Sequence, residues 1–139
     1  MNEKIIALLE SKNVKATAVR ILVLDVFMNI DHALALNDLE KILPWSDRAS
    51  LFRSLKTFEA NGIIHKVNDG DRSAKYALCS EHCSIDHHHV HPHFHCTKCG
   101  KTLCLSRQNI KIPNIPQGFI ANDYSLIING TCANCASAF

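Results

Sequence analysis

The chain has 139 residues and a net charge of +2, and 47% of its residues are hydrophobic. This length fits one ordinary domain or two small ones, and the apolar content excludes wholesale disorder. The charge is too small to indicate nucleic-acid binding by itself, so a DNA-binding face would need local clustering of basic residues. Residues 1–15 lack the pattern of a signal peptide and no stretch approaches the length of a membrane span, so we expect a cytoplasmic protein without membrane contact.

The first part of the chain shows the pattern of several short helices. Residues 3–11 have helical spacing, and Thr17 is suited to cap a second helix with an apolar stripe at Val19, Leu22, Val23, Val26 and Phe27. A third helix is predicted over residues 36–43 and ends at Pro44. A fourth helix is expected to begin at Ser46 or Asp47 and to stop at Asn61-Gly62.

A hairpin is predicted directly after these helices. Residues 62–67 and 73–78 read as two strands, and residues 68–71 have the composition of a turn. Short helices followed by a hairpin are typical of a winged helix-turn-helix domain.

The fourth predicted helix has two different faces. Leu51, Leu55 and Phe58 share an apolar face. Small and basic residues with one aromatic ring occupy the opposite face and its margins: Arg48, Ala49, Phe52, Arg53, Lys56 and Thr57. Such side chains can reach guanine edges, phosphates or a thymine methyl group. An ordinary solvated face explains the composition as well, but the position before the hairpin favours a recognition helix.

All seven cysteines lie in residues 79–139, and four of them form the pairs Cys96-x-x-Cys99 and Cys132-x-x-Cys135. In a chain without an export signal, such pairs are expected to be metal ligands and not disulfides. Zn(II) takes four tetrahedral thiolates, and a two-residue spacer lets both thiolates of a pair face one ion. We therefore predict a structural zinc site, the alternative being four ordinary buried cysteines.

The region around the cysteine pairs predicts strands and little helix. Residues 93–99 lead into a strand, and residues 118–130 alternate enough to form another. Pro113 and Pro116 leave little room for a long helix between them. Gly100, directly after the first pair, lets the backbone turn closely.

Six of the nine histidines lie within residues 87–95 and run into the first cysteine pair. His91 and His93 alternate along a predicted strand and therefore project to one face. His87, His88 and His89 can equally be solvated residues of a hinge. A second, exchangeable metal site could draw on these histidines together with His65, Cys79, Cys83 and Cys104, and such mixed donors favour Zn(II).

These motifs together resemble the ferric uptake regulator (Fur) family of bacterial metal-sensing repressors over nearly the whole chain. The matching segments are residues 17–20, 48–67, 93–101 and 125–135. The resemblance implies an α+β fold with a winged helix-turn-helix DNA-binding domain in residues 1–78 and a hinge in residues 79–90. It also implies a small α/β dimerisation domain with the four-cysteine zinc site in residues 91–139. A homodimer that binds palindromic double-stranded operator DNA in response to metal is expected.

The resemblance also implies roles for individual residues, most closely those of the zinc uptake regulator (Zur) branch. Cys96, Cys99, Cys132 and Cys135 match the structural zinc site. The sensor site is expected at His65, Cys79, His91, His93 and Cys104, with Cys83 and His89 in reserve. Cys104 stands where relatives carry a carboxylate, which argues for zinc and against iron or manganese. Expected DNA contacts are Thr17, Arg20, Arg48, Ser50, Phe52, Arg53 and Lys56.

The leading hypothesis is a zinc-responsive repressor with one structural and one regulatory Zn(II) per chain. Tyr124 replaces a histidine of an accessory site, so we expect no third site. An iron-responsive regulator is the nearest alternative, and a peroxide sensor is disfavoured by the extra thiolates. A metallohydrolase would need an open zinc and a general base, and no His-Glu-x-x-His motif occurs, so we expect no enzyme. A zinc store would leave the winged-helix half without a role.

Overall fold

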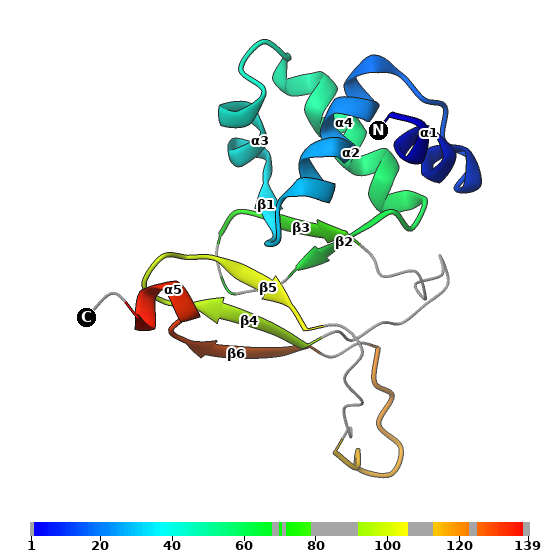
Figure 1. Cartoon of the computed structure of the whole chain (residues 1–139). Helices are drawn as coiled ribbons and strands as arrows, with labels where there is room; N and C mark the ends of the chain where they lie inside the picture. Colours follow the sequence, from blue (N-terminus) through cyan, green and yellow to red (C-terminus); the bar gives the residue numbers. More distant parts are fainter. Residues whose placement is uncertain are drawn as a thin grey trace.

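The structure is a computed structural model that describes residues 2–67, 70, 72–78, 92–105, 113–122 and 125–137. The helices are α1 (Asn2–Ser11), α2 (Ala18–Asn29), α3 (Leu36–Ile42), α4 (Arg48–Ala60) and α5 (Ala133–Ala136). The strands are β1 (Leu34–Ala35), β2 (Ile64–Val67), β3 (Lys75–Leu78), β4 (Pro92–Cys96), β5 (Thr102–Cys104) and β6 (Leu126–Gly130). Helices α1 to α4 form one group, and two small sheets follow beneath them (Figure 1). Among the residues described, no helix combines the length and apolar character that a membrane crossing requires.

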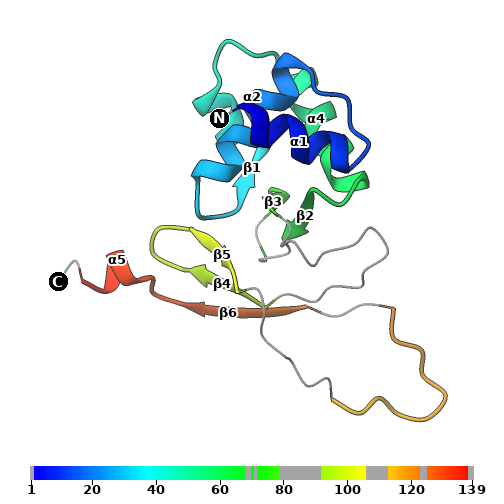
Figure 2. The ribbon, with the colours of Figure 1, turned by 45° about the vertical axis from the view of Figure 1, so that its right-hand side comes forward.

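Within the described residues, each sheet has three strands. The first has the order β1-β3-β2 with antiparallel pairing, and the second has the order β5-β4-β6. In the second sheet β4 pairs antiparallel with β5 and parallel with β6. The first sheet lies between the helices and the second sheet in both views of the ribbon (Figures 1 and 2). This arrangement confirms the predicted α+β class with an N-terminal winged helix.

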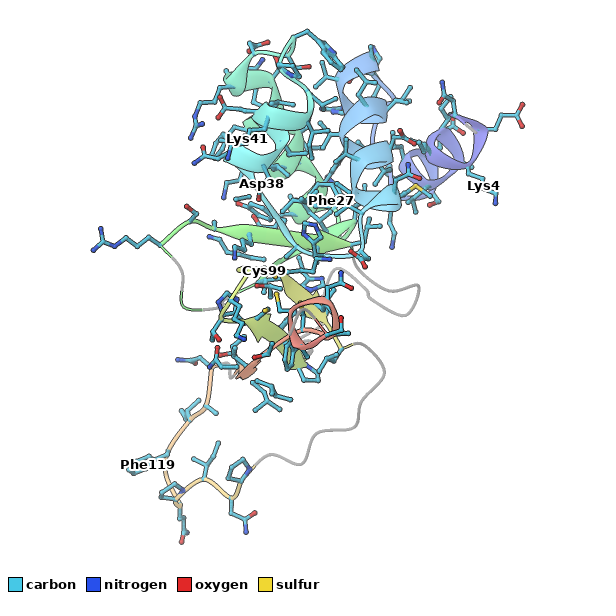
Figure 3. The ribbon with its side chains drawn as sticks, turned by 60° about the vertical axis from the view of Figure 1, so that its left-hand side comes forward. Lys4, Phe27, Asp38, Lys41, Cys99 and Phe119 are labelled. Carbon is cyan, nitrogen blue, oxygen red and sulfur yellow. The ribbon has the colours of Figure 1, made fainter. Side chains whose placement is uncertain are left out.

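The connection between β5 and β6 is only partly described. Residues 113–122 carry neither helix nor strand, as the two prolines led us to expect. The predicted strand over residues 118–130 is confirmed only in its second part, where β6 begins at Leu126. Figure 3 shows Phe119 at the far end of this extended segment, away from both sheets.

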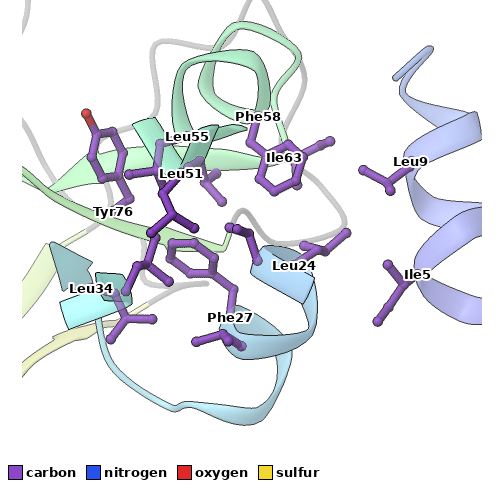
Figure 4. Close-up of a cluster of buried hydrophobic side chains, with 14 of the residues drawn as sticks. Ile5, Leu9, Leu24, Phe27, Leu34, Leu51, Leu55, Phe58, Ile63 and Tyr76 are labelled. Atoms are coloured by element: carbon purple, nitrogen blue, oxygen red, sulfur yellow. The ribbon is translucent and has the colours of Figure 1, made fainter. Parts of the chain in front are cut away.

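The main core lies between the helices and the first sheet (Figure 4). The predicted inner face of α4 is confirmed, because Leu51, Leu55 and Phe58 are buried. The stripe predicted for α2 is wrong at one position, since Leu22 is 37% exposed and Leu24 is fully buried. Helix α2 packs against α1, α4 and β3 together, so its buried arc is wider than a single stripe and is shifted toward Leu24.

Side-chain caps set the starts of the two helices that matter most for the DNA-binding half. The Thr17 side chain accepts a hydrogen bond from the Arg20 amide at 3.3 Å and begins α2. Asp47, one of the two predicted candidates, accepts from the Ser50 amide at 3.0 Å and begins α4. Such caps typically stabilise a helix by about 1 kcal/mol. Helix α4 ends as predicted, with Gly62 in the left-handed region at φ 73°.

Candidate metal centres and nucleic-acid interface

The exposed face of α4 and the start of α2 form one surface. Every predicted DNA contact except Arg48 lines an open hollow of about 440 Å³ between these two helices: Thr17, Arg20, Ser50, Phe52, Arg53 and Lys56. Phe52 is 46% exposed and presents an apolar ring to this surface. The hollow therefore combines cationic, hydroxyl and aromatic groups on a rigid helical frame.

Polar contacts within α4 orient the side chains of this surface. The Ser50 hydroxyl donates to Asp47 at 2.7 Å, and the Arg53 guanidinium donates to the Ser50 hydroxyl at 3.1 Å. The hydrogen bond from Ser50 also lowers the pKa of the Asp47 carboxyl. The Lys56 ammonium lies 5.5 Å from the centre of the Phe52 ring. Arg53 is thus held at one point and leaves donors directed elsewhere.

Arg48 lies apart from this surface. Its guanidinium donates to the Asn37 side chain at 3.0 Å and forms an ion pair with Glu40, so it is turned toward α3. Sequence reasoning missed Asn37 and Glu40, because an exposed amide and carboxylate on a neighbouring helix carry no signal of their own. The other arginine of the set, Arg20, donates to the Lys15 carbonyl at 2.8 Å.

The two cysteine pairs meet because β4 and β6 are parallel neighbours. Their register places Cys96, the last residue of β4, beside Gly130, the last residue of β6. Both pairs therefore leave the sheet at the same edge. Cys99 lies in the turn after β4, Cys132 precedes α5, and Cys135 lies within α5. The short helix α5, which was not predicted, brings the second pair over the first.

The four sulfur atoms lie within 4.8 Å of one another. The Sγ atoms of Cys99 and Cys132 are 3.8 Å apart, which matches the edge of about 3.8 Å in a tetrahedron with Zn–S bonds of about 2.3 Å. Cys96 is buried, as expected for the inner ligand of a closed site. The geometry and the donor set therefore fit one zinc ion.

Backbone amides polarise the thiols unequally. The amides of Cys99 and Cys132 donate to Cys96 Sγ at 3.5 and 3.3 Å, and these hydrogen bonds lower the pKa of Cys96 to about 5. The hydrogen bond with Cys132 raises the pKa of Cys135 to about 12. A divalent ion at the cluster favours full deprotonation of all four thiols.

A second group of donors spans the two sheets. His65 lies on β2 of the first sheet, while His93 and Cys104 are paired across β4 and β5 of the second. Their ligand atoms lie within 4.8 Å of one another. The Nε2 atoms of His65 and His93 are 3.3 Å apart, as expected for two imidazoles on one tetrahedral zinc with Zn–N bonds of about 2.0–2.1 Å. This trio can bind a metal only when the two sheets face each other.

Several predicted donors lie outside the described residues. They are Cys79, Cys83, His89 and His91, together with His87 and His88. The structure therefore brings together three of the five main sensor candidates, His65, His93 and Cys104, and the fourth ligand stays a prediction.

Comparison with known proteins identifies the family of this chain. The sequence matches the model of the Ferric uptake regulator family over residues 11–124. The ferric uptake regulation protein of Bordetella parapertussis is 27% identical over 136 residues, which cover 91% of this chain and 93% of that protein.

Two solved structures show the similarity of fold. The ferric uptake regulator of Vibrio cholerae has 20% identity and a TM-score of 0.63, covering 91% of this chain and 98% of its own. A zinc uptake regulator solved with zinc and DNA has 21% identity and a TM-score of 0.64, covering 98% and 95%. The family match includes helix α4, the hairpin, the first cysteine pair and the trio that spans the sheets, and this chain therefore belongs to the ferric uptake regulator family.

Proposed function

We propose that this metal-responsive transcription regulator is a zinc-responsive repressor that binds palindromic operator DNA as a homodimer. The observation that carries the proposal is the trio of His65, His93 and Cys104, which joins the winged helix to the C-terminal sheet. A metal held by these residues cross-links the two halves when it is bound. The availability of the metal then sets the orientation of the DNA-binding half.

The donor set supports zinc as the sensed metal. Two imidazoles and one thiolate suit Zn(II), whereas Mn(II) prefers oxygen donors. The named relative from Bordetella parapertussis is a ferric uptake regulation protein, so iron is the second candidate. Metal analysis after growth with competing metals, followed by add-back of each metal to the depleted protein, separates the two. The zinc proposal fails if Fe(II) alone restores DNA binding.

We propose a structural role for the four-cysteine cluster. Four thiolates close the coordination sphere of zinc and leave no position for an exchanging ligand. The cluster joins the ends of β4 and β6, so it stabilises the second sheet at the edge where both strands terminate. A closed site of this kind contributes to folding, and the regulatory response then falls to the trio.

We propose α4 as the recognition helix, with Arg53 and Lys56 as its main cationic contacts and Phe52 as an apolar contact. The open hollow beside them supplies further hydroxyl and cationic groups from Thr17, Ser50 and Arg20. In a dimer, two such helices address two half-sites about one helical turn apart, which requires a palindrome.

The second sheet offers a surface for the second copy. Strand β6 is the outer one of the strands described in this sheet, and its side chains Leu126 and Ile128 are 39% and 44% exposed. Phe119 and Ile120 in the preceding segment are exposed to 71% and 88%. Apolar side chains on an outer strand favour association, and a two-fold axis is the commonest solution for identical chains.

A direct test is an electrophoretic mobility shift with the DNA upstream of the protein's own coding sequence. We expect a shift that requires added zinc and that a zinc chelator reverses. A shift of equal strength without zinc would overturn the proposed regulation. Absence of any shift at saturating zinc, with the zinc-loaded dimer verified by mass, would exclude this DNA as a target and count against autoregulation.

The fourth sensor ligand is a separate question. Cys79 directly follows β3, and we propose it as the ligand that completes the trio. Cys79→Ser should leave the structural zinc and the dimer intact while abolishing zinc-dependent DNA binding. If wild type and variant respond at the same free zinc, another residue completes the site.

A further inference from the structure

The two halves of the molecule also meet at a place that contains no metal ligand. The backbone amide of Ala33, just before β1, donates to the carbonyl of Thr102, the first residue of β5, at 2.8 Å. Both residues are buried, with exposed fractions of 5% and 1%. If this contact opened without rehydration, a buried donor and a buried acceptor would lose their partners, so the hydrogen bond favours one docked arrangement.

Two lysines flank this hydrogen bond. Lys101 Nζ lies 3.7 Å from the Asp31 carboxylate, and Lys75 Nζ donates to the Gly100 carbonyl at 3.2 Å. The Asp31 side chain is 81% exposed, so its ion pair contributes little on its own. The contacts of residues 31–33 and 75 with residues 100–102 nevertheless all fall on one short turn. We call this group the knuckle clasp.

The turn of the knuckle clasp is built by the first cysteine pair. Gly100 follows Cys99, has φ 80°, and donates its amide to the Cys96 carbonyl at 2.9 Å. The Cys96 amide in turn donates to the Lys101 carbonyl at 2.9 Å. Residues 100 and 101 are therefore fixed by the same backbone that presents Cys96 and Cys99 to the four-cysteine cluster.

Strand β5 connects the knuckle clasp to the sensor trio. It begins at Thr102, which accepts from Ala33, and it ends at Cys104, which belongs to the trio. On the other side, Ala33 packs with Val67 and Ala77, and Ala77 is the strand partner of His65. Because these strands are short and paired, the knuckle clasp and the trio depend on the same orientation of the first sheet relative to the second.

We propose that the knuckle clasp is a docking element by which the four-cysteine site orients the winged helix for the sensor site. The clasp holds the two halves near the geometry in which His65 meets His93 and Cys104 before any regulatory metal binds. The structural site is thus coupled to sensing, and Lys75, Lys101 and Asp31 act as positioning residues. The effect on sensor affinity rests on the proposed function, whereas the docking itself does not.

The first test measures docking through amide exchange of the full chain with the structural site loaded and the sensor site empty. In the double variant Lys75→Met with Lys101→Met, the Ala33 amide should exchange about three- to tenfold faster than in wild type, since two polar contacts are lost. The Leu24 amide, buried in α2, should keep its wild-type rate. Lys41→Met with Lys66→Met removes the same charge from exposed positions and should leave Ala33 unchanged.

Equal Ala33 exchange in wild type and in the Lys75/Lys101 variant would overturn the docking element. An equal acceleration in the Lys41/Lys66 control would also overturn it, because the effect would then follow net charge. If Leu24 accelerates with Ala33, the single variants Lys75→Met and Lys101→Met are measured instead. Selective acceleration at Ala33 in either one supports the clasp, and its absence in both overturns it.

The second test titrates zinc into the sensor site against a chelator of known affinity. The Lys75/Lys101 variant should bind this second zinc about three- to tenfold more weakly, while its structural zinc stays at one per chain. Unchanged affinity despite faster Ala33 exchange would overturn the coupling. If wild type itself binds no second zinc, the proposed function fails, and the exchange experiment still decides the docking.

Discussion

Arg53 is the side chain on which the proposed DNA contact depends most directly. It is exposed on α4 and is oriented by a hydrogen bond to Ser50. Arg53→Ala should weaken operator binding without changing zinc content or dimerisation. If Arg53 contacts a guanine, the loss should be about 1–3 kcal/mol and concentrated at one base pair.

The measurement for Arg53 is fluorescence anisotropy with the operator and with each single base-pair substitution. Lys56→Ala serves as the matched cation on the same face. If Lys56 contacts a phosphate, its loss should weaken all sequences alike and lower the salt slope by about 1. Wild-type affinity of Arg53→Ala for every operator would move the recognition surface away from α4.

Arg48 raises a different expectation, because Glu40 and Asn37 hold its guanidinium against α3. Arg48 is the first residue of the proposed recognition helix, and Glu40→Gln removes the carboxylate that competes with DNA for its guanidinium. We expect tighter binding to DNA of any sequence, with a salt slope steeper by about 0.9 for one added phosphate contact. The gain should vanish in the Arg48→Ala background. A gain of the same size there would show that the carboxylate acts by simple repulsion of DNA.

At the scale of single elements, local chemistry predicted the DNA-binding half well. The caps at Thr17 and Asp47 and the stop at Gly62 follow from nearest neighbours in the sequence, and the structure confirms them. The shift from Leu22 to Leu24 could not be predicted, because it depends on which elements surround α2. Strands β1 and β5 are too short to show alternation, so only their long-range pairing reveals them.

The metal centres also have one part that the sequence predicts and one part that depends on long-range strand pairing. The residue types and the spacing of the cysteines predicted one cluster, whereas the meeting of its two pairs depends on the parallel register of β4 and β6. The resemblance to the family placed His65, His93 and Cys104 in one site, and the facing of two sheets brings them together. The hydrogen bond between Ala33 and Thr102 could not be predicted from the sequence, because it joins backbone groups that nearly every residue has.

The four-cysteine cluster is expected to stabilise the second sheet. Cys96→Ser removes the buried ligand at the end of β4, and structural zinc sites contribute on the order of 10 kcal/mol to folding. We expect loss of the tightly held zinc and loss of the second sheet, while the helices of the first half remain. Metal analysis and circular dichroism measure both. A folded dimer of Cys96→Ser without bound metal would contradict the structural role.

For the molecule as a whole, the proposed regulation requires that the orientation of the helices and first sheet relative to the second sheet depend on a metal. The helices and the first sheet form one core, and the second sheet is held by its own strand pairing and by the cysteine cluster. Within the described part of the chain, the trio and the knuckle clasp are the main polar links between the two parts. The proposed regulation requires that a ligand decide the orientation, and a ligand does so by binding one arrangement of the two parts more tightly than the other.

Substitution of Cys104 gives the most direct test of the proposed sensor site, because Cys104 supplies the thiolate of the trio. A shift of the DNA-competent population from 1% to 99% requires that zinc favour that state by roughly 5.5 kcal/mol, and a lost thiolate removes a large part of this preference. Cys104→Ser should therefore keep one structural zinc per chain and the dimer, yet bind operator weakly at any free zinc concentration. Cys104→Asp, which places an oxygen donor in the trio, should respond to Mn(II) or Fe(II) better than the wild type does. The measurement is operator binding titrated with each metal. A Cys104→Ser protein that responds to the same free zinc as wild type would mean that the trio of His65, His93 and Cys104 is not the sensor.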